Sequence, residues 1–473
     1  MTTAEQAPTD QMVDRATSET TQQIRPNGLL RKVNLDDVFF SATDQRGAIT
    51  AASAVFDQLA AWPISQPEDR PRYPPHHPDM PGAVMRQLWQ HIALGRPFAG
   101  YIRNLARDGL TYWTFTTVKP VTGGYLSIHT APCDGAVFKL AEEIYERLVP
   151  LEETCWLDGL SREEAAAEGQ RALEEVLKAI GFAGYGDFMA RALPSETTAR
   201  LARLSYSAGV TQVGGNALAP AMALARQLDQ LLGRLSSLQD LTGELIGGAR
   251  QLTSTTTALH GLTARAAQAS DLAEPRAPIL TAASRAMTSL ENSLAATAGA
   301  LPAHLASVHQ AVGELRFGIA LAHRHTVAVL AFIDELRQGF VLPAAAASIP
   351  VLFTALTDSV RSLSGQALQA SATLGGLAQE IAVCGRRLAQ LEKLLASWRL
   401  AVPRYGLSTT LEAIVEPIDQ HLAQGLDQAQ RLRQLSDACS RQAAAISCQA
   451  FASPVTGLVE EISHYQVGLN PPA

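Results

Sequence analysis

The residues best equipped for chemistry lie between Tyr73 and Thr130. His76 and His77 directly precede Pro78 and Asp79, so two imidazoles and a carboxylate share a loop that proline stiffens. Neutral imidazole can donate or accept a hydrogen bond, and a carboxylate accepts them. Trp89 and Asn104 follow in the same stretch, which is also the densest in aromatic and turn residues. We therefore expect a ligand to bind here.

Two other interpretations of the same residues stay open. A neutral imidazole is a common axial ligand of haem, and His76, His77, His91 and His129 are available. None of the four occupies a position that we can assign to a haem-binding helix. In the second interpretation Asp79 caps a helix that begins at Pro81, and the aromatic residues form a core.

The elements that must position these residues are short strands and helices. Asp108-Gly109 and Gly123-Gly124 are flanked by aromatic and β-branched runs, which is a strong signal for hairpins. The pattern predicts strands over 38–43, 48–52, 100–104, 111–118 and 125–130, and short helices over 53–59 and 83–89. A longer helix over 136–151 follows, and Ser161 to Glu164 is a capping box that opens another helix.

The order of helix, strand, hairpin and strand resembles the second half of a PAS sensor domain. Two motifs, His77-Pro78-Asp79-Met80-Pro81 and Asp108-Gly109-x-x-Tyr112-Trp113, are similar to motifs in the PAS domain of bacterial aerotaxis transducers. The resemblance spans residues 30 to 133. That family holds FAD and reports redox state. The resemblance implies that His77 and Asp79 bind FAD, with His76 standing where the family has arginine. Trp89 and Asn104 match family positions, whereas Ser53 stands where the family has Asn.

Composition bounds the remaining function classes. The chain has 473 residues and a formal net charge of −7 without a basic patch, so we expect no nucleic-acid partner. Five widely spaced cysteines without a CxxC pair suit a reducing cytoplasm. No signal peptide is visible, and the apolar stretches 319–333 and 340–356 are interrupted by polar residues or proline, so we expect a cytoplasmic protein without membrane insertion. No triad, phosphate-binding loop or HExxH motif is present, and we expect no enzyme.

From about residue 220 the composition turns to Ala, Leu, Gln, Ser and Thr with heptad spacing, which favours coiled-coil or bundle packing and a homodimer. One run begins at Leu224 and ends at Leu259, and the other extends from Leu363 to Trp398 through Cys384. We expect the prolines at 275, 278, 302, 343, 350, 403 and 417 to divide this region into helices of about 20 to 50 residues. It is similar to chemoreceptor signalling domains, in which residues 312–321 would form the hairpin turn, but the kinase-contacting tip is missing.

His323-Arg324-His325 is interpreted as a polar break in a buried helix rather than a metal pair, because residues two apart on a helix face different sides.

The sequence therefore predicts an α+β PAS sensor followed by an all-α bundle. The expected divisions are a disordered leader over 1–29, the sensor over 30–134, a helical connector over 135–205 and the output region over 206–473. We expect redox or oxygen sensing through FAD, relayed through residues 136–180 to possible chemotaxis-type signalling partners. The alternative is a dimerisation scaffold with no cofactor, or a PAS protein that binds haem or another small ligand.

Overall fold

The structure is a computed structural model, which describes residues 24–62, 76–207, 219–273, 277–337, 349–405, 412–423 and 427–447. Most of the predicted leader, the proline-rich loop 63–75 and Cys448 lie outside the described residues. The last leader residues contact the sheet domain: Asn27 N donates to Gly109 O at 3.0 Å, and Thr111 N donates to Leu29 O at 2.9 Å.

A five-stranded antiparallel sheet forms the N-terminal α+β region, in the order β2-β1-β5-β4-β3. Its strands are β1 (Val38–Asp44), β2 (Ile49–Ala52), β3 (Phe98–Leu105), β4 (Thr111–Val121) and β5 (Gly124–Thr130). The hairpin predictions are confirmed, since β3 pairs with β4 and β4 with β5. Gly109 and Gly123 have φ of 84° and 86°, which glycine adopts without a Cβ clash. The fold-class prediction is confirmed as well.

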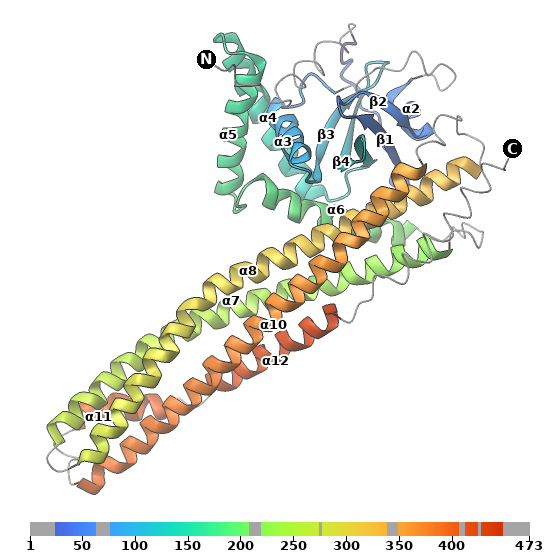
Figure 1. Cartoon of the computed structure of the whole chain (residues 1–473). Coiled ribbons are helices and arrows are strands. Elements are labelled where there is room, and N and C mark those ends of the chain that lie inside the picture. Colours follow the sequence, from blue (N-terminus) through green and yellow to red (C-terminus); the bar gives the residue numbers. More distant parts are fainter. Residues whose placement is uncertain are drawn as a thin grey trace, which may run out of the picture. The chain divides into compact units, whose positions relative to one another are not determined.

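In the described part of the first half of the chain, five helices accompany the sheet (Figure 1). They are α2 (Ala54–Ala60), α3 (Gly82–Ala93), α4 (Gly135–Leu157), α5 (Arg162–Ala179) and α6 (Tyr185–Ser207). The capping box predicted at Ser161 is present, with Ser161 Oγ accepting from Glu164 N and the Glu164 carboxylate accepting from Ser161 N. Helix α3 packs on β3, β4, α4 and α5, so it is held between the sheet and a helical layer.

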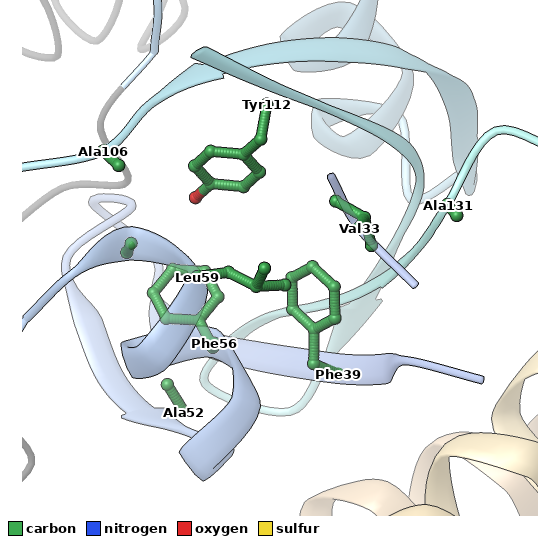
Figure 2. Packing of buried hydrophobic residues seen from close by; sticks show 9 residues of the cluster. Val33, Phe39, Ala52, Phe56, Leu59, Ala106, Tyr112 and Ala131 are labelled. Atoms are coloured by element: carbon green, nitrogen blue, oxygen red, sulfur yellow. The ribbon is translucent and has the colours of Figure 1, made fainter. Parts of the chain in front are cut away.

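One apolar cluster joins α2 to the inner face of the sheet. Figure 2 shows Phe56 and Leu59 of α2 beside Phe39 of β1 and Tyr112 of β4, and all four side chains are buried. Fully burying a large apolar side chain is worth about 1.5 to 3 kcal/mol, so this cluster fixes α2 on the sheet.

The C-terminal half is helical, as predicted, but its helices are longer. They are α7 (Ala219–Ala273), α8 (Pro278–Arg337) and α10 (Ile349–Ala401), followed by a short 3₁₀ helix (Val402–Tyr405), α11 (Glu412–Ala423) and α12 (Asp427–Ser447). Pro302 lies inside α8 and Pro417 inside α11, so the predicted divisions at these two prolines are wrong. Residues 312–321, which we expected at a hairpin turn, also lie inside α8, so that expectation is wrong.

The chain divides into two compact units. The first contains the sheet domain together with residues up to 233 and the segment 316–364, and the second contains 234–315 and 365–450. In the second unit, Trp398 Nε1 of α10 donates to Ser270 Oγ of α7 at 2.9 Å, and Ser436 Oγ of α12 donates to Ala378 O of α10 at 2.8 Å. The heptad side chains Leu252, Leu259, Leu388 and Leu391 are fully buried there.

Within the first unit, α8 and α10 contact the outer face of the sheet. Phe332 of α8 meets Phe40 of β1 edge to face, with ring centroids 4.8 Å apart. Lys119 Nζ of β4 donates to Ala355 O and Ser359 Oγ of α10, at 2.7 and 2.8 Å. By length and composition α8 could cross a membrane, but 67% of its most apolar window is buried in the structure.

Candidate functional site: a cavity between α3 and the sheet

A cavity lies between the inner face of the sheet and α3. Alternate residues of β1, β3, β4 and β5 face it, because side chains of a strand point to opposite sides in turn. They are Phe39, Ser41 and Thr43 of β1, Ile102 and Asn104 of β3, Tyr112, Thr116 and Val118 of β4, and Tyr125, Ser127 and His129 of β5. Met85, Leu88, Trp89 and Ile92 of α3 close the opposite wall, at the spacing of one helix face. His76, Gly47 and Phe56 complete the lining.

The space available to the centres of water-sized molecules is about 70 Å³. A single buried water needs only about 10 to 15 Å³ by this measure, so the cavity can hold several. Its α3 wall is apolar, with Leu88 and Ile92 buried and Met85 and Trp89 half-buried. A planar, mainly apolar group with polar edges would match this combination of surfaces.

A chain of hydrogen bonds crosses the sheet on the cavity side. Asn104 Nδ2 donates to Thr114 Oγ1 at 3.1 Å, and Thr114 Oγ1 lies 2.9 Å from Thr116 Oγ1. Thr116 Oγ1 is 2.9 Å from His129 Nδ1, and His129 Nε2 is 3.3 Å from Ser41 Oγ. Asn104 donates at one end of the chain, and when each hydroxyl donates onward, Thr116 Oγ1 donates to His129 Nδ1 and the His129 proton lies on Nε2.

Burial keeps the cavity imidazoles neutral. It lowers the pKa of His129 to about 3, with an additional contribution from nearby His76. It lowers the pKa of His76 to about 4, and His76 Nδ1 is buried without a partner among the described residues. The backbone of His76 pairs with Asn104 in an isolated β-bridge, which holds the imidazole beside the end of the polar chain. His76 therefore offers a lone nitrogen to any ligand in the cavity.

The wall formed by α3 is anchored by a carboxylate from a distant helix. Glu152 of α4 accepts hydrogen bonds from Gly82 N and Ala83 N, at 2.7 and 2.8 Å. These amides belong to the first turn of α3 and have no partner inside the helix. Gly169 of α5 makes room for the anchor, because a Cβ there would lie 2.2 Å from Glu152 Oε1. Burial raises the pKa of Glu152 to about 7, and the two amide hydrogen bonds oppose that shift.

Comparison with known proteins finds a similarity to a receptor. No family model matches the sequence. Over 118 residues it is 29% identical to the aerotaxis receptor of Escherichia coli (strain K12), a match that covers 24% of this chain and 23% of the receptor. The similarity is distant and partial. The sheet domain is PAS-like, with five antiparallel strands and a helix-walled cavity.

The structure brings together three of the six residues predicted for the aerotaxis-like site. His76, Trp89 and Asn104 line the cavity. The Trp89 ring meets Tyr125 edge to face at 5.9 Å, which joins α3 to β5 across the cavity. His77, Asp79 and Ser53 are not among the residues that line it.

The other three predicted residues support the surrounding loops. Asp79 pairs with Arg103, its Oδ2 lying 3.2 Å from Arg103 Nη1, and it does not cap α3, so the capping interpretation is wrong. His77 Nδ1 accepts from Asp79 N at 3.0 Å, and its own N donates to Arg103 O at 3.0 Å. Ser53 Oγ caps α2 by accepting from Phe56 N at 3.4 Å, and it accepts from Phe40 N at 3.2 Å.

The sequence interpretation missed Ser41, Thr114 and Thr116, and it considered His129 only as a haem ligand. The strand alternation contained a signal, because Thr114, Thr116 and His129 fall on the same side of their strands as the residues that face α3. It shows that these side chains meet only once the pairing of Thr116 with His129 is known.

The polar triplet 323–325 is confirmed as part of a buried helix, since all three side chains are at most 4% exposed within α8. Among the described residues there is no group of three or more His, Cys, Asp or Glu that could hold a metal ion. Cys384 is fully buried in α10, in keeping with the predicted packing position.

Proposed function

We propose that the chain is a sensory signalling protein whose PAS-like domain binds a flavin, FAD in the first instance, between α3 and the sheet. The observation that carries this proposal is the cavity itself: apolar walls enclose a chain of hydrogen-bonded polar side chains and the Nδ1 of His76, which no described residue pairs. The partial similarity to an aerotaxis receptor supports a sensory role.

The residues fit the ring system of a flavin better than its phosphates. Asn104, Thr116 and His76 can donate to or accept from the nitrogen and oxygen edge of the ring, while Ile102 and Leu88 supply apolar contacts. The lining residues that the structure describes include no Lys or Arg for a diphosphate.

Haem is the second candidate, and the free nitrogen of His76 favours it. His129 has both ring nitrogens engaged by Thr116 and Ser41, whereas His76 Nδ1 has no partner in the part of the chain that the structure describes. A neutral imidazole with a free nitrogen is the group that binds haem iron. Of the histidines considered for this role, His76 is therefore the one that the cavity presents.

Relay from the cavity uses both faces of the same strands. Thr116 and His129 face the ligand site, and the adjacent Phe115 and Thr130 face the other way and contact Arg324 of α8. A ligand that changes its hydrogen bonding to the polar chain would shift β4 and β5 and bias their packing on α8. This route supplements the relay through residues 136–180, where Tyr145 OH of α4 donates to Tyr101 O of β3 at 2.7 Å.

The proposal also covers setting and partners. We propose a non-enzymatic cytoplasmic protein that forms a homodimer and acts on chemotaxis-type signalling partners, with no nucleic acid bound. The non-sensory scaffold remains the competing function, because a folded PAS-like domain can dimerise without a cofactor.

The visible absorption spectrum of the purified full chain tests the ligand. A flavin gives a yellow protein and haem a red one, and chromatography of the released pigment separates FAD from smaller flavins. Asn104→Leu removes the donor that starts the polar chain and should weaken flavin binding at least about tenfold, the effect of 1.4 kcal/mol. Trp113→Phe, next to the site but on the outer face, is the matched control. If the protein stays colourless after reconstitution with flavin and with haemin, both ligand proposals are refuted and the scaffold function is the one that remains.

A further inference from the structure

A second, smaller cavity lies on the opposite face of the sheet, where α6 and α8 meet it. Thr130 of β5, Thr197 and Arg200 of α6, and His323 and Arg324 of α8 line it. The space for the centres of water-sized molecules is about 10 Å³, which is the lower limit for one water molecule. None of these residues lines the ligand cavity described above.

Arg324 has donors in this region that the described residues do not use. Its Nη1 donates to Thr130 Oγ1 and, at 3.5 Å, to Phe115 O. Its Nε and Nη2 are buried and have no acceptor within hydrogen-bond distance in the described part of the chain. These two atoms lie on one edge of the guanidinium, where their N–H bonds form the parallel fork that binds anions. The side chain is only 4% exposed, so bulk water cannot satisfy the fork.

Both arginines and carboxylates surround this corner. Burial lowers the pKa of Arg324 to about 10, the nearby Glu196 carboxylate opposes that decrease, and Arg200 adds to it. Glu196 is the nearby carboxylate, but its oxygens already accept from Tyr101 OH and from the amides of Cys133 and Asp134, at 2.6, 2.6 and 3.1 Å. His323 faces Asp229, with Nε2 and Oδ1 2.9 Å apart. Burial lowers the pKa of Arg200, and the carboxylates of Asp36 and Asp37 oppose that decrease.

We propose that this cavity is a binding site for one small monovalent anion of the size of chloride, held by the Nε and Nη2 fork of Arg324 opposite Arg200. A buried guanidinium is costly when its donors stay unpaired, and an anion satisfies both the donors and the charge. The hydroxyls of Thr130 and Thr197 already donate to Phe115 O and Leu193 O, at 3.5 and 2.8 Å, so the Arg324 fork supplies the hydrogen bonds to the anion. The bound anion joins β5, α6 and α8, so it stabilises the docking of α8 on the sheet.

Bromide gives a direct test, because it is close to chloride in size and charge and has an anomalous X-ray signal. Crystals of the full chain grown or soaked in sodium bromide should show an anomalous peak within about 3.5 Å of Arg324 Nε and Nη2. Bromide bound elsewhere, with only a water at this position, would overturn the proposal.

Thermal unfolding tests the same site in solution. At constant ionic strength, replacing sodium gluconate by sodium chloride should raise the Tm by roughly 2 °C or more, because the anion binds only the folded state. Arg324→Met keeps the apolar stem and removes the fork, so it should abolish the chloride response. Arg361→Met, which removes an exposed arginine of α10, should retain it.

The two measurements together decide the outcome. An equal chloride response in the Arg324→Met and Arg361→Met variants would show general salt effects and refute the site. If Arg324→Met does not fold, the bromide map of the unaltered protein decides alone. The result is independent of the flavin proposal, since a colourless protein can still bind bromide at Arg324.

Discussion

Thr116 and Thr117 are neighbours in β4, but their hydroxyls differ in hydrogen bonding. Thr116 Oγ1 links Thr114 to His129 on the cavity side, whereas Thr117 Oγ1 is buried without a partner among the described residues. Thr116→Val should destabilise the fold by roughly 1 to 3 kcal/mol, because it leaves the His129 nitrogen unsatisfied. Thr117→Val should be neutral or stabilising, because it removes an unpaired polar group. Urea unfolding of the two isosteric variants measures the difference, and equal losses would contradict the polar chain.

The neutral imidazole of His129 also makes stability depend on pH. Its folded pKa is depressed to about 3, below the unfolded value near 6.5, so the unfolded chain takes up a proton first as the pH falls. The free energy of unfolding should therefore be unaffected by this residue above pH 6.5 and should decrease between pH 6.5 and 5. His129→Gln should have a shallower decrease in that window. The unfolding free energy at half-unit pH steps measures it, and an unchanged slope would argue against a buried neutral His129.

At the scale of elements, the cavity depends on how α3 is held. Its N-terminus has no side-chain cap of its own and relies on Glu152 of α4. Glu152→Ala should cost roughly 0.5 to 2 kcal/mol, the typical value of a helix cap. It should also speed hydrogen exchange at Gly82 and Ala83 and weaken ligand binding, because α3 forms one wall.

Glu153→Ala is the control for this prediction, since the neighbouring side chain is exposed. Glu152→Gln keeps an acceptor oxygen and should lose less stability than the alanine variant. If exchange at Gly82 and Ala83 were the same in the Glu152→Ala and Glu153→Ala variants, the anchoring role of α4 would be refuted.

At the scale of the whole molecule, the heptad side chains can pack either within one chain or between two chains. Leu252, Leu259, Leu388 and Leu391 are already buried within one chain, so these seams are occupied by the chain's own helices. The predicted homodimer must then use other apolar residues, and Leu272, Ile279, Leu368 and Leu400 of the second unit are 64 to 72% exposed.

Light scattering at micromolar concentration should give the mass of two chains. Leu368→Lys and Leu400→Lys together should shift the protein toward the monomer, because burying a charge at an interface is costly. Leu94→Lys, at an exposed residue of the sheet domain, should leave the mass unchanged. A monomeric unaltered protein would overturn the homodimer.

Fractionation tests the proposed cytoplasmic location. The apolar window of α8 is largely buried against the protein, which lowers its gain from entering lipid. We expect the full chain in the supernatant after cell lysis without detergent. Recovery only from membranes that have been washed with salt and carbonate would show that α8 or another segment is inserted.

What the sequence determined by itself is local. The turns at Gly109 and Gly123, the strand alternation, the Ser161 capping box and the heptad spacing are properties of a few consecutive residues, and backbone sterics or side-chain periodicity decide them. These signals were enough for the order of the strands along the chain, the positions of the short helices and the α+β then all-α fold class. Three residues of the cavity lining, His76, Trp89 and Asn104, were predicted from sequence motifs in the same way.

Tertiary structure alone decided the contacts between distant residues. Glu152 lies 70 residues from the amide that it caps, and Arg324 lies 194 residues from the threonine that it binds. Asp79 pairs with Arg103 rather than capping α3, and Pro302 stays inside a helix. Such partners are chosen by packing and by the need to satisfy buried donors and acceptors, which depends on which surfaces meet in the folded chain and leaves no trace in local spacing.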